Sequence, residues 1–328
     1  MKRIVCLNPA VSTTNMGDHI IAECAKEQLQ CVLRDSFTVD ISTHLPISDF
    51  YADYLANADL RFVLGTNLLR NTMTRKFRQW DIDARSAKKL SPSVLMGVGW
   101  HNDGEACPRR VENLYRTILA ASPYTHSVRD SYTLKRLSEL GITNVLNTGC
   151  PSMWKLTSEH CRTIPEGKAE NVVFTVTDYH PNVEDDVRVL RLLKARYKTV
   201  YIWLQGYYDA DYLRENALCD GVTVLPPALA GYDALLSRDD VEYVGTRLHG
   251  GIRALQHGRR TMILAVDERA VEKQKDFNLP VVRRTECDRL EALIEASRPT
   301  EIHIAEREIA QWKAQFAPFA DRREDGVE

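Results

Sequence analysis

The sequence predicts an α/β protein of two Rossmann-like domains whose parallel sheets face a central cleft, and three observations predict this fold. The length of 328 residues exceeds one ordinary core and suits two domains. Short apolar runs alternate with longer amphipathic segments nearly from end to end, which is typical of β-α-β units. Between the halves, Lys155–Glu170 is polar and lacks both helix and strand periodicity, so we interpret it as the interdomain link.

The first half begins with a strand. Within the N-terminal segment Met1–Leu7, the apolar run is broken by Asn8-Pro9 and does not reach the roughly 7–15 residues of a signal-peptide core, so a buried strand is expected there. Apolar residues at helical spacing predict helices over Asp18–Arg34 and over Ser131–Leu140, the latter ending before Gly141. The expected strands are Arg3–Leu7, Phe37–Ile41, Arg61–Leu64, Val94–Val98, His126–Val128 and Val145–Leu146.

The second half repeats this scheme, and a last helix is expected over Glu301–Phe316 before a charged tail, Asp321–Glu328. The predicted domains are therefore residues 1–160 and 161–300, followed by a C-terminal helix and tail over 301–328. The expected strands are Val172–Val176, Val200–Leu204, Val222–Leu225, Glu242–Val244 and Thr261–Ala265. The expected helices are Val183–Arg196, Asp209–Ala217, Tyr232–Ser237 and Gly250–His257.

The composition excludes several classes of protein. Forty-three Lys and Arg balance forty-five Asp and Glu, so the net charge of -2 offers no basic field for nucleic acid, and an anionic ligand needs a local cluster of cations. No run approaches the ~18 apolar residues of a membrane span. The eight cysteines form neither a C-x-x-C pair nor a Cys/His zinc spacing. We therefore expect free thiols, a cytoplasmic location, and no metal or cofactor.

Ligands of two such domains are expected at the carboxyl ends of the parallel strands, where three loops carry candidate residues. The first loop joins the first strand to the first helix and contains Asn15, Gly17 and Asp18. A glycine beside Asn and Asp at a helix N-terminus can expose backbone N–H groups to an anion. The alternative is that Asp18 simply caps the helix. Since the loop lacks G-x-G-x-x-G, it carries no dinucleotide-binding motif.

The second and third loops each bring an arginine to a strand-to-helix turn. Arg129 can fork onto a carboxylate or phosphate, or instead pair with Asp130. In the third loop, Arg247 supplies a bidentate donor and Gly250-Gly251 permits close backbone approach at a helix N-terminus. His249 titrates near neutrality and can transfer a proton, although a lone histidine at a helix start is as often a capping or packing residue.

Together these loops resemble the polysaccharide pyruvyl transferase family, whose members have the two-Rossmann-domain glycosyltransferase (GT-B) architecture. The resemblance starts at Asn15-Met-Gly-Asp18 and continues through Ser127-Val-Arg-Asp130 with its following Leu-x-x-Leu-x-x-Leu-Gly helix. It extends to Gly245-Thr-Arg-Leu-His249 and Asp267-x-x-x-x-x-Lys273, so it covers most of residues 1–280.

The resemblance implies a transferase that moves the pyruvyl group of phosphoenolpyruvate onto two sugar hydroxyls, forming a pyruvate ketal and releasing phosphate. It implies that Arg129 and Arg247 hold the donor's phosphate and carboxylate and that His249 is the catalytic acid/base. The residue types suit this chemistry, because arginine forks bind anions and a histidine can protonate the donor's methylene carbon. The remaining implied donor-binding residues are Leu248, Asn15, Gly17 and Asp18.

The acceptor is expected to be a polysaccharide or a lipid-linked precursor, with at most transient membrane contact. The N-terminal domain is the expected acceptor side and the C-terminal domain the donor side. Aromatic, amide and carboxylate groups in the loops Gly99–Asp103, Asp178–His180 and Gln205–Tyr208 suit a sugar surface, and ordinary loop composition is the alternative. The acceptor-binding candidates are Trp100, His101, Asp178, His180 and Gln205.

Two other readings of the same sequence stay open. One is a GT-B glycosyltransferase that uses a nucleotide-sugar donor, and the other is a non-catalytic glycan-binding relative. Cys150 lies in Thr148–Ser152, where many family members carry an Asp-Pro pair, and is either a loop thiol or an acceptor-site residue. A nucleophilic role for it is disfavoured because no base is identified nearby. The sequence specifies neither the acceptor sugar nor the oligomeric state.

Overall fold

The computed structural model describes residues 1–72, 79–101 and 106–320, and its contacts divide the chain into two compact units. Unit 1 contains Met1–Thr13, Ile21–Trp154 and the segment from Ala305 onward. Unit 2 contains Lys155–Ile304 together with Thr14–Ile20. The predicted tail at 321–328 and residues 102 and 103 of a predicted acceptor loop lie outside the described residues.

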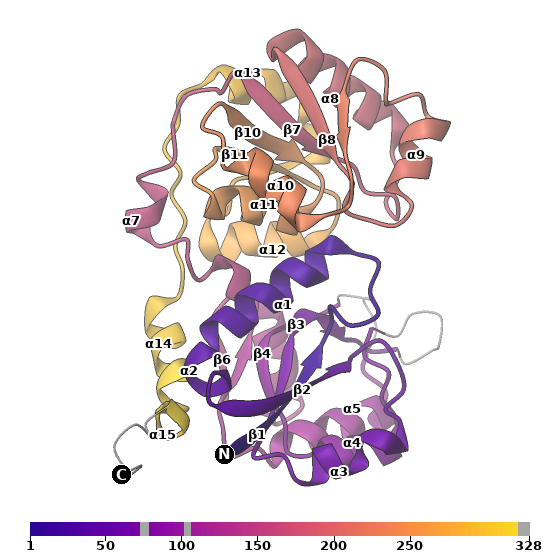
Figure 1. Cartoon of the computed structure of the whole chain (residues 1–328), viewed down its shortest axis with the longest axis vertical. Coiled ribbons are helices and arrows are strands. Elements are labelled where there is room, and N and C mark those ends of the chain that lie inside the picture. The colour runs from indigo at the N-terminus through magenta and orange to yellow at the C-terminus, as the bar shows by residue number, and fades with distance from the viewer. Residues whose placement is uncertain (73–78, 102–105, 321–328) are drawn as a thin grey trace. The chain divides into compact units, whose positions relative to one another are not determined.

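Unit 1 is built on a six-stranded parallel sheet in the described residues, ordered β2-β1-β3-β4-β5-β6 (Figure 1). Its strands are β1 (Lys2–Asn8), β2 (Ser36–Ser42), β3 (Leu60–Leu69), β4 (Val94–Trp100), β5 (His126–Val128) and β6 (Val145–Asn147). The order reverses between β1 and β3, which is the switch point of this sheet. Strands β1 and β4 are buried almost throughout, as expected of a parallel sheet covered on both faces.

Helices connect the strands of unit 1. They are α1 (Met16–Gln28), α2 (Gln30–Leu33), α3 (Ala52–Ala56), α4 (Ala84–Leu90), α5 (Arg109–Tyr115) and α6 (Ser131–Glu139). Single turns lie at Asp49–Tyr51 and Pro151–Met153, and a π-helical turn at Arg116–Ala120. The predicted helix over Asp18–Arg34 is thus two helices, because Leu29, with φ -95° and ψ 6°, leaves the helical conformation between them.

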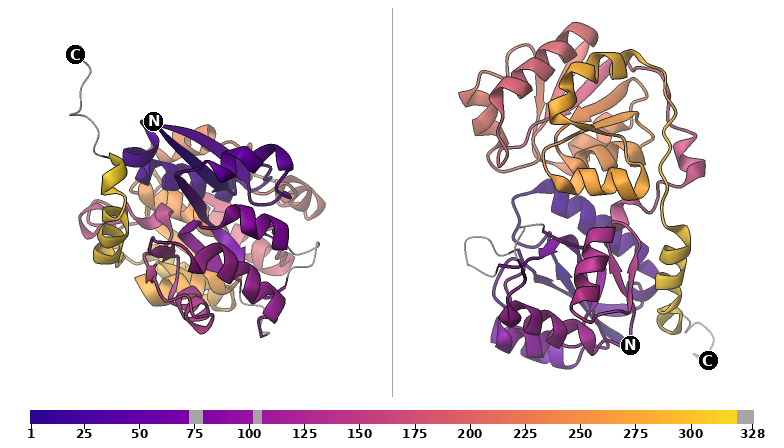
Figure 2. Two further views of the ribbon diagram at one scale, coloured as in Figure 1. Left: turned by 90° about the horizontal axis from the view of Figure 1, so that it is seen from below. Right: turned by 180° about the vertical axis from the view of Figure 1, so that it is seen from behind.

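The C-terminal segment belongs to unit 1. Helices α14 (Glu306–Ala314) and α15 (Ala317–Ala320) run alongside this unit in Figures 1 and 2. The fully buried Trp312 packs edge-on against Phe62 of β3 and against Trp154, with ring centroids 6.4 and 5.8 Å apart. These aromatic contacts show why the helix predicted after residue 301 completes the first core instead of standing alone.

Unit 2 repeats the architecture, with the described strands again forming a six-stranded parallel sheet, ordered β12-β11-β10-β7-β8-β9. The strands are β7 (Asn171–Thr175), β8 (Thr199–Trp203), β9 (Thr223–Leu225), β10 (Val241–Gly245), β11 (Thr261–Ala265) and β12 (Val281–Arg283). The switch point lies between β7 and β10. Two six-stranded parallel sheets confirm the predicted α/β class with two Rossmann-like domains.

Helices cover both faces of the second sheet because alternate residues of each strand point to opposite sides. Val172 and Phe174 of β7 share a core with Val189 and Leu193 of α8. On the opposite face, Gly251 of α11 lies against β10 and β11. The helices are α7 (Ser158–Cys161), α8 (Val183–Arg196), α9 (Asp209–Glu215), α10 (Leu229–Leu236), α11 (Leu248–Gln256), α12 (Glu268–Phe277) and α13 (Leu290–Glu295), with a turn at Arg284–Arg289 before the last.

Candidate functional site

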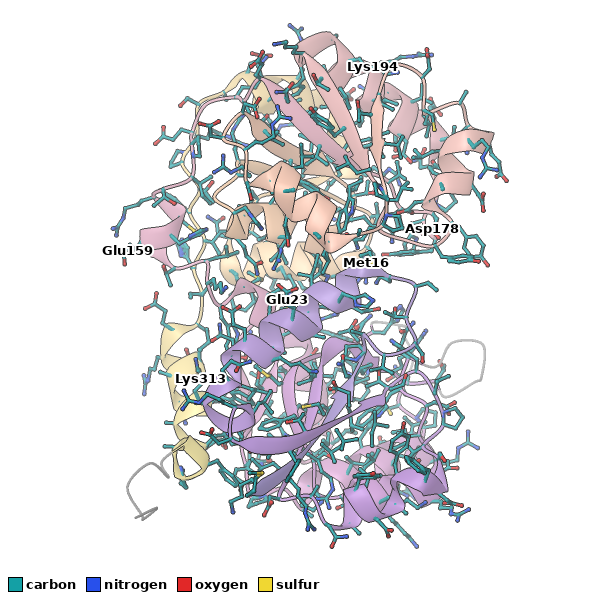
Figure 3. The ribbon with its side chains drawn as sticks, viewed as in Figure 1. Met16, Glu23, Glu159, Asp178, Lys194 and Lys313 are labelled. Carbon is teal, nitrogen blue, oxygen red and sulfur yellow. The ribbon has the colours of Figure 1, made fainter. Side chains whose placement is uncertain are left out.

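The candidate site lies in unit 2, at the carboxyl ends of the strands that flank the switch point. In open parallel sheets the connections after the two flanking strands run to opposite faces and leave room for a ligand. Asp178, labelled in Figure 3, follows β7, and Arg247 follows β10. Gln205 follows the neighbouring β8, and Asp267 follows β11. The predicted third loop is therefore at the place where this topology favours binding.

Arg247 is the buried centre of the site, with 2% of its surface exposed. Its Nε donates to the carbonyl of Val176 at 2.8 Å, and its Nη2 donates to Asp178 Oδ1 at 2.7 Å and to Asp209 Oδ1. Among the described residues, its Nη1 has no hydrogen-bond partner. Two carboxylates thus hold the guanidinium, and one of its edges is available to a ligand.

The charges of this cluster are coupled. Burial works against ionisation of Arg247, but the carboxylates of Asp209 and Asp178 outweigh it and raise the pKa of the guanidinium. Burial raises the pKa of Asp209, against the opposing effects of Arg247 and of the backbone N–H groups of Gly206 and Gln205. Asp209 Oδ2 accepts from those two N–H groups at 2.7 and 2.9 Å. The carboxylate therefore fixes Arg247 and the turn after β8 at once.

The backbone that presents Arg247 is also fixed. Tyr243 donates its hydroxyl to the carbonyl of Arg247 at 2.7 Å, and Arg247 N donates to Thr175 Oγ1 at 3.2 Å. Gly206 passes so close that a Cβ on it would lie 2.2 Å from Arg247 Nη2. A larger residue at 206 would displace the guanidinium, which explains a glycine at this position.

Helix α11 starts directly after Arg247 and places His249 in its first turn. Its first turn leaves backbone N–H groups without helical partners, and the helix dipole makes that end favourable for an anion. His249 is half-buried and lines the same pocket as Arg247 and Leu248. Gly251 allows α11 to approach the sheet, since a Cβ there would lie 2.5 Å from Ile263. The glycine pair thus serves helix packing as well as the site.

A second arginine, Arg269, lines the pocket from the first turn of α12. Its side chain is bound to both oxygens of Asp267 and donates from Nη2 to the hydroxyl of Tyr179 at 2.8 Å. Tyr179 also lies over Arg247, whose guanidinium carbon is 5.0 Å from the ring centroid. The loop after β7 therefore contacts both cations. Asp178 and Tyr179 contact Arg247, and Tyr179 also contacts Arg269.

The turn at Asn15 completes the pocket within unit 2. Asn15 Oδ1 accepts from Gly17 N at 3.0 Å and from Gln205 Nε2 at 3.2 Å, and Met16 N donates to the carbonyl of Gln205 at 2.9 Å. A Cβ on Gly17 would lie 2.9 Å from Gln205 Nε2. Asp18 is buried and accepts from Asn15 Nδ2 at 3.4 Å. The predicted first loop is thus held against Gln205 by hydrogen bonds from both residues.

The pocket that these groups line is small. Its free space is about 20 Å³, which is roughly the room for one water molecule. Its lining residues are Asn15, Tyr179, Gln205, Thr246, Arg247, Leu248, His249, Val266, Asp267, Arg269 and Ala270. A ligand larger than water therefore requires side chains to move, and Tyr179 is the one among them that is half exposed, at 51%.

Arg129 occupies a comparable position in unit 1, at the end of β5 and the start of α6. It is 5% exposed, and its Nε donates to Asp130 Oδ2 at 2.8 Å while Nη2 donates to Asn67 Oδ1 at 2.8 Å. Asp130 also caps α6 by accepting from Thr133 N at 2.8 Å. Gly99 of β4 lies against the guanidinium, since a Cβ there would be 2.0 Å from Nε. The pairing with Asp130 is thus present, and it is buried.

The other predicted residues are spread over both units. Trp100 is 2% exposed, packs edge-on against Tyr115 at 5.3 Å, and donates from Nε1 to Asn71, so its side chain lies in the core of unit 1. His101 follows it and donates from its backbone N to Leu69 O at 2.7 Å. Neither residue lines the pocket around Arg247.

His180 is exposed and contacts Tyr179 edge-on at 5.1 Å. Cys150 is buried in unit 1 and accepts from Ser152 Oγ at 3.0 Å, which makes it an inaccessible loop thiol. Asp178 and Gln205, predicted for the acceptor, instead contact Arg247 and Asn15 in the predicted donor set.

Sequence reasoning missed Asp209, Asp267 and Arg269 as site residues. The family motif quoted above contains Asp267 and Lys273, and Lys273 is 1% exposed and buried in α12. Arg269 lies on the first turn of the same helix, after β11, where the rule for strand ends could have identified it. In the described part of the chain, no three His, Cys, Asp or Glu side chains gather to hold a metal ion. Nor does any described helix combine the length and apolar character of a membrane span.

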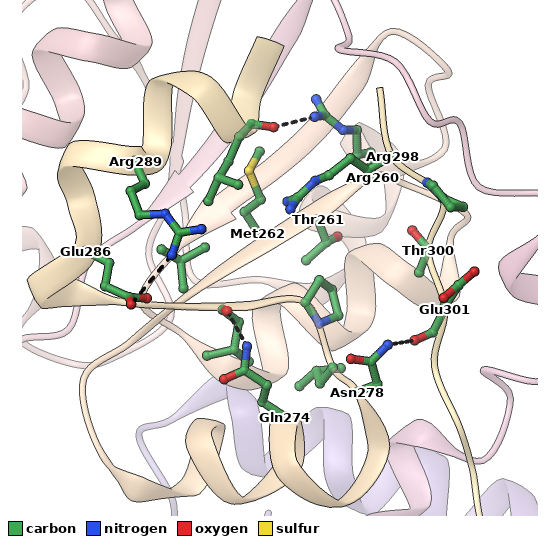
Figure 4. Close-up of a pocket in the computed structure, with 16 residues that line it drawn as sticks. Arg260, Thr261, Met262, Gln274, Asn278, Glu286, Arg289, Arg298, Thr300 and Glu301 are labelled. Atoms are coloured by element: carbon green, nitrogen blue, oxygen red, sulfur yellow. Dashed lines mark hydrogen bonds and ion pairs between the residues drawn. The ribbon is translucent and has the colours of Figure 1, made fainter. Parts of the chain in front are cut away.

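A larger hollow of about 470 Å³ lies elsewhere in unit 2, beside β11, β12 and α12 (Figure 4). Two of the arginines that line it, Arg289 and Arg260, are held by neighbouring groups. Arg289 pairs with Glu286 at 3.7 Å, and Arg260 donates to Glu242 and to the last carbonyls of α13. None of the predicted site residues lines it. The smaller pocket around Arg247 is therefore the better candidate for chemistry.

The model of the family described as polysaccharide pyruvyl transferase matches residues 15–268, a span from the Asn15 turn to the start of α12. A search of curated proteins found no match.

Solved structures with a similar chain path include UDP-GlcNAc 2-epimerase from Neisseria meningitidis, at 12% identity and TM-score 0.48, covering 97% of this chain and 99% of that one. They also include E. coli heptosyltransferase WaaC, at 13% identity and TM-score 0.40, covering 80% and 88%. The lipopolysaccharide outer core galactosyltransferase WaaB matches at 12% identity and TM-score 0.45, covering 98% and 94%. Likenesses this distant add nothing to what the two parallel sheets already establish.

Proposed function

The chain belongs to the polysaccharide pyruvyl transferase family, and from that premise we propose that it transfers the pyruvyl group of phosphoenolpyruvate to two hydroxyls of a sugar. The acceptor sugar belongs to a polysaccharide or to its lipid-linked precursor, and phosphate is released. The observation that carries the proposal is the convergence of Arg247, Arg269 and His249 on one pocket at the start of α11.

The donor carries two anionic groups, and the pocket offers cations and N–H donors for them. Arg247 contributes its Nη1 edge, Arg269 a second guanidinium, and the first turn of α11 its backbone N–H groups. Leu248 and the turn at Asn15, Gly17 and Asp18 close the pocket around them. For Arg129, which lies in unit 1, the proposal of a donor-binding role rests on the family resemblance alone.

Donor binding has to displace part of the loop after β7. The free space of about 20 Å³ admits one water. Asp178 holds Nη2 and Tyr179 covers one face of the guanidinium of Arg247, so Nη1 alone is left open by the described residues and a bidentate anion needs Nη2 as well. We propose that the donor replaces Asp178 on the guanidinium. Because one anion replaces another, the buried positive charge of Arg247 stays compensated. Departure of Asp178 without a replacement would leave that charge less compensated.

The reaction requires one proton transfer to carbon. A sugar hydroxyl oxygen forms a bond to C2 of phosphoenolpyruvate while His249 gives its proton to C3, so the methylene becomes a methyl group. His249 then holds the proton of that hydroxyl. The second hydroxyl attacks C2, and the bond from C2 to the phosphate oxygen breaks with its electron pair. Phosphate leaves with the remaining proton, stabilised by the arginines. The ketal and phosphate together contain all atoms of the reactants.

The acceptor is proposed to approach where Asp178, His180 and Gln205 lie, after β7 and β8. Trp100 is not proposed to bind the acceptor, because its indole is in the core of unit 1. A cytoplasmic location is proposed because the described cysteines that were predicted as thiols are free. Contact with a membrane is limited to encounters with a lipid-linked acceptor.

The test is phosphate release by the purified protein from phosphoenolpyruvate with a panel of sugar acceptors. Release that depends on both substrates, with a pyruvate ketal in the product by NMR, supports the proposal. Thermal stabilisation by UDP or GDP but not by phosphoenolpyruvate, with no release, would instead identify a nucleotide-sugar transferase.

A further inference from the structure

Two consecutive tyrosines next to the pocket have no packing role in the core. Tyr207 and Tyr208 are 67% and 61% exposed, and they contact each other edge to face with ring centroids 4.9 Å apart at 90°. Single exposed aromatic residues are common, but an adjacent pair beside a binding pocket indicates a contact surface. We call this pair the tyrosine platform.

The platform stands on a rigid turn. Gln205 N and Gly206 N both donate to the buried carboxylate of Asp209, and Met16 N holds the carbonyl of Gln205. Tyr208 is the N-cap residue directly before α9. Ordering two exposed rings on a fixed backbone reduces the entropy that a ligand has to overcome. The turn is therefore built to present the rings outward.

The platform is also adjacent to the chemistry. Gly206 precedes Tyr207 and touches both the guanidinium of Arg247 and Asp178, at 2.2 and 3.1 Å from the position of a Cβ. Consecutive Cα atoms are about 3.8 Å apart, so the first ring is attached one residue from the site cation. A ligand on the platform would have its reactive group within a sugar's length of the pocket.

Charge decides between the ligands that bind aromatic surfaces. The segments after β7 and β8, residues 176–187 and 204–213, contain no Lys or Arg. They contain the carboxylates Asp178, Glu184, Asp185, Asp186, Asp209 and Asp211. Five of these six carboxylates pair with arginines from outside the two segments: Asp178 and Asp209 with Arg247, Asp185 and Asp186 with Arg284, and Asp211 with Arg214. The two segments themselves therefore contribute no cation that would attract an anionic lipid headgroup, while paired carboxylates can still accept from neutral hydroxyls.

We infer that the tyrosine platform binds a pyranose ring of the acceptor glycan, with the C–H face on the aromatic rings and the hydroxyls toward Asp178 and the pocket. This inference rests on the proposed function for the identity of the donor. It adds Tyr207 and Tyr208 to the acceptor approach proposed at Asp178, His180 and Gln205, all of which lie in unit 2. The occupant is a neutral sugar, and a membrane surface or another protein is an outcome that the test has to exclude.

The test compares the double variant Tyr207→Ala/Tyr208→Ala with Tyr207→Phe/Tyr208→Phe and with Phe50→Ala. Phe50 is 72% exposed in a separate aromatic group of unit 1, so it is a matched control for the loss of an exposed ring. Binding is measured without donor, by saturation-transfer NMR and affinity electrophoresis, against a panel of neutral polysaccharides and methyl hexopyranosides. Phosphatidylglycerol/phosphatidylcholine vesicles are the second probe.

The alanine pair is expected to weaken glycan binding about tenfold, and the phenylalanine pair and Phe50→Ala to leave it within about twofold. Stabilisation by phosphoenolpyruvate should be equal in all four proteins. Unchanged glycan binding in the alanine pair, an equal loss in Phe50→Ala, no glycan binding by any protein, or loss of vesicle binding instead overturns the inference. Because binding is measured without turnover, a platform that binds glycan while no phosphate is ever released separates this inference from a failed proposed function.

Discussion

Arg129 and Arg247 are two versions of one arrangement, and the difference between them is why we propose that the chemistry lies at Arg247. Each follows a strand, precedes a helix, is at least 95% buried, and lies against a glycine of a neighbouring strand or its following turn. Arg247 lies beside the switch point of its sheet, between β7 and β10. Arg129 follows β5, two strands from β3 at the switch point of unit 1. The same local sequence device therefore occupies a ligand-favouring place in only one unit.

The histidines near the two arginines differ more than the arginines do. His126 begins β5 and is fully buried: its Nδ1 accepts from Leu95 N at 3.2 Å, and its Nε2 is 3.1 Å from Leu119 O. This arrangement suits one neutral tautomer. His249 instead lies at the pocket after Arg247. One histidine fills a structural position, and the other is the one that we propose transfers a proton.

The largest expected effect comes from His249→Ala. Removing a general acid typically lowers turnover by about 10²–10⁴, while the arginines that bind the donor stay in place. Phosphate release should fall by that factor with thermal stabilisation by phosphoenolpyruvate retained. If stabilisation by the donor and the fold are lost together, His249 is a packing residue like His126.

The next largest expected effect is the dependence of stability on pH that His126 produces. Burial lowers the pKa of His126 from about 6.5 to about 4, partly opposed by the carbonyl of Leu119. Between these values the unfolded chain binds a proton that the folded protein does not, so stability is present at neutral pH and is lost on acidification, by about 3 kcal/mol. Urea unfolding from pH 7 to pH 4 measures it. His126→Gln can keep both hydrogen bonds without titrating, so its pH dependence should be flatter, and an equal slope would refute this assignment.

Replacing the glycines beside the two arginines should lower the free energy of unfolding by a smaller amount. Gly206→Ala and Gly99→Ala each force a held guanidinium to move, at about 1–3 kcal/mol of stability. Gly231→Ala, in α10 with open space around it, is the control and should gain about 0.5–1 kcal/mol. Chemical denaturation measures all three. Gly206→Ala should also weaken the donor's stabilising effect. If it leaves that effect unchanged, Arg247 is not the donor-binding cation.

The smallest expected effect is on the KM for phosphoenolpyruvate and comes from the carboxylates that hold Arg247. Arg129 has one carboxylate partner and Arg247 has two, and Asp178 is the one we propose the donor displaces. Asp178→Asn should therefore lower the KM for phosphoenolpyruvate about two- to fivefold, since the competing charge is gone. Asp209→Asn is the contrast and should raise it, because the buried guanidinium loses its anchor. A higher KM in Asp178→Asn would make Asp178 a positioning residue instead.

The sequence predicted the two sheets well because parallel strands are short, apolar and separated by helical patterns. It missed β12, a three-residue edge strand, and it joined α1 to α2 because a single non-helical residue leaves no periodicity signal. Arg247, Leu248, His249, Asn15 and Gln205 were identified and line one pocket. The pairing of Arg247 with Asp178 and Asp209 could not be predicted, since it depends on side chains from three strand ends meeting in space.

The turn at Asn15 has a consequence for the order in which the protein is made. It is synthesised near the start of the chain, yet its partner Gln205 follows 190 residues later. During translation the first sheet can form while this turn waits without its contact, since domains form from the N-terminus onward. The pocket is therefore completed only after Gln205 and the later residues that line it have been synthesised. A chain that ends before α11 would carry the first sheet without the C-terminal helix that completes its core, and it would have no assembled pocket to sequester donor.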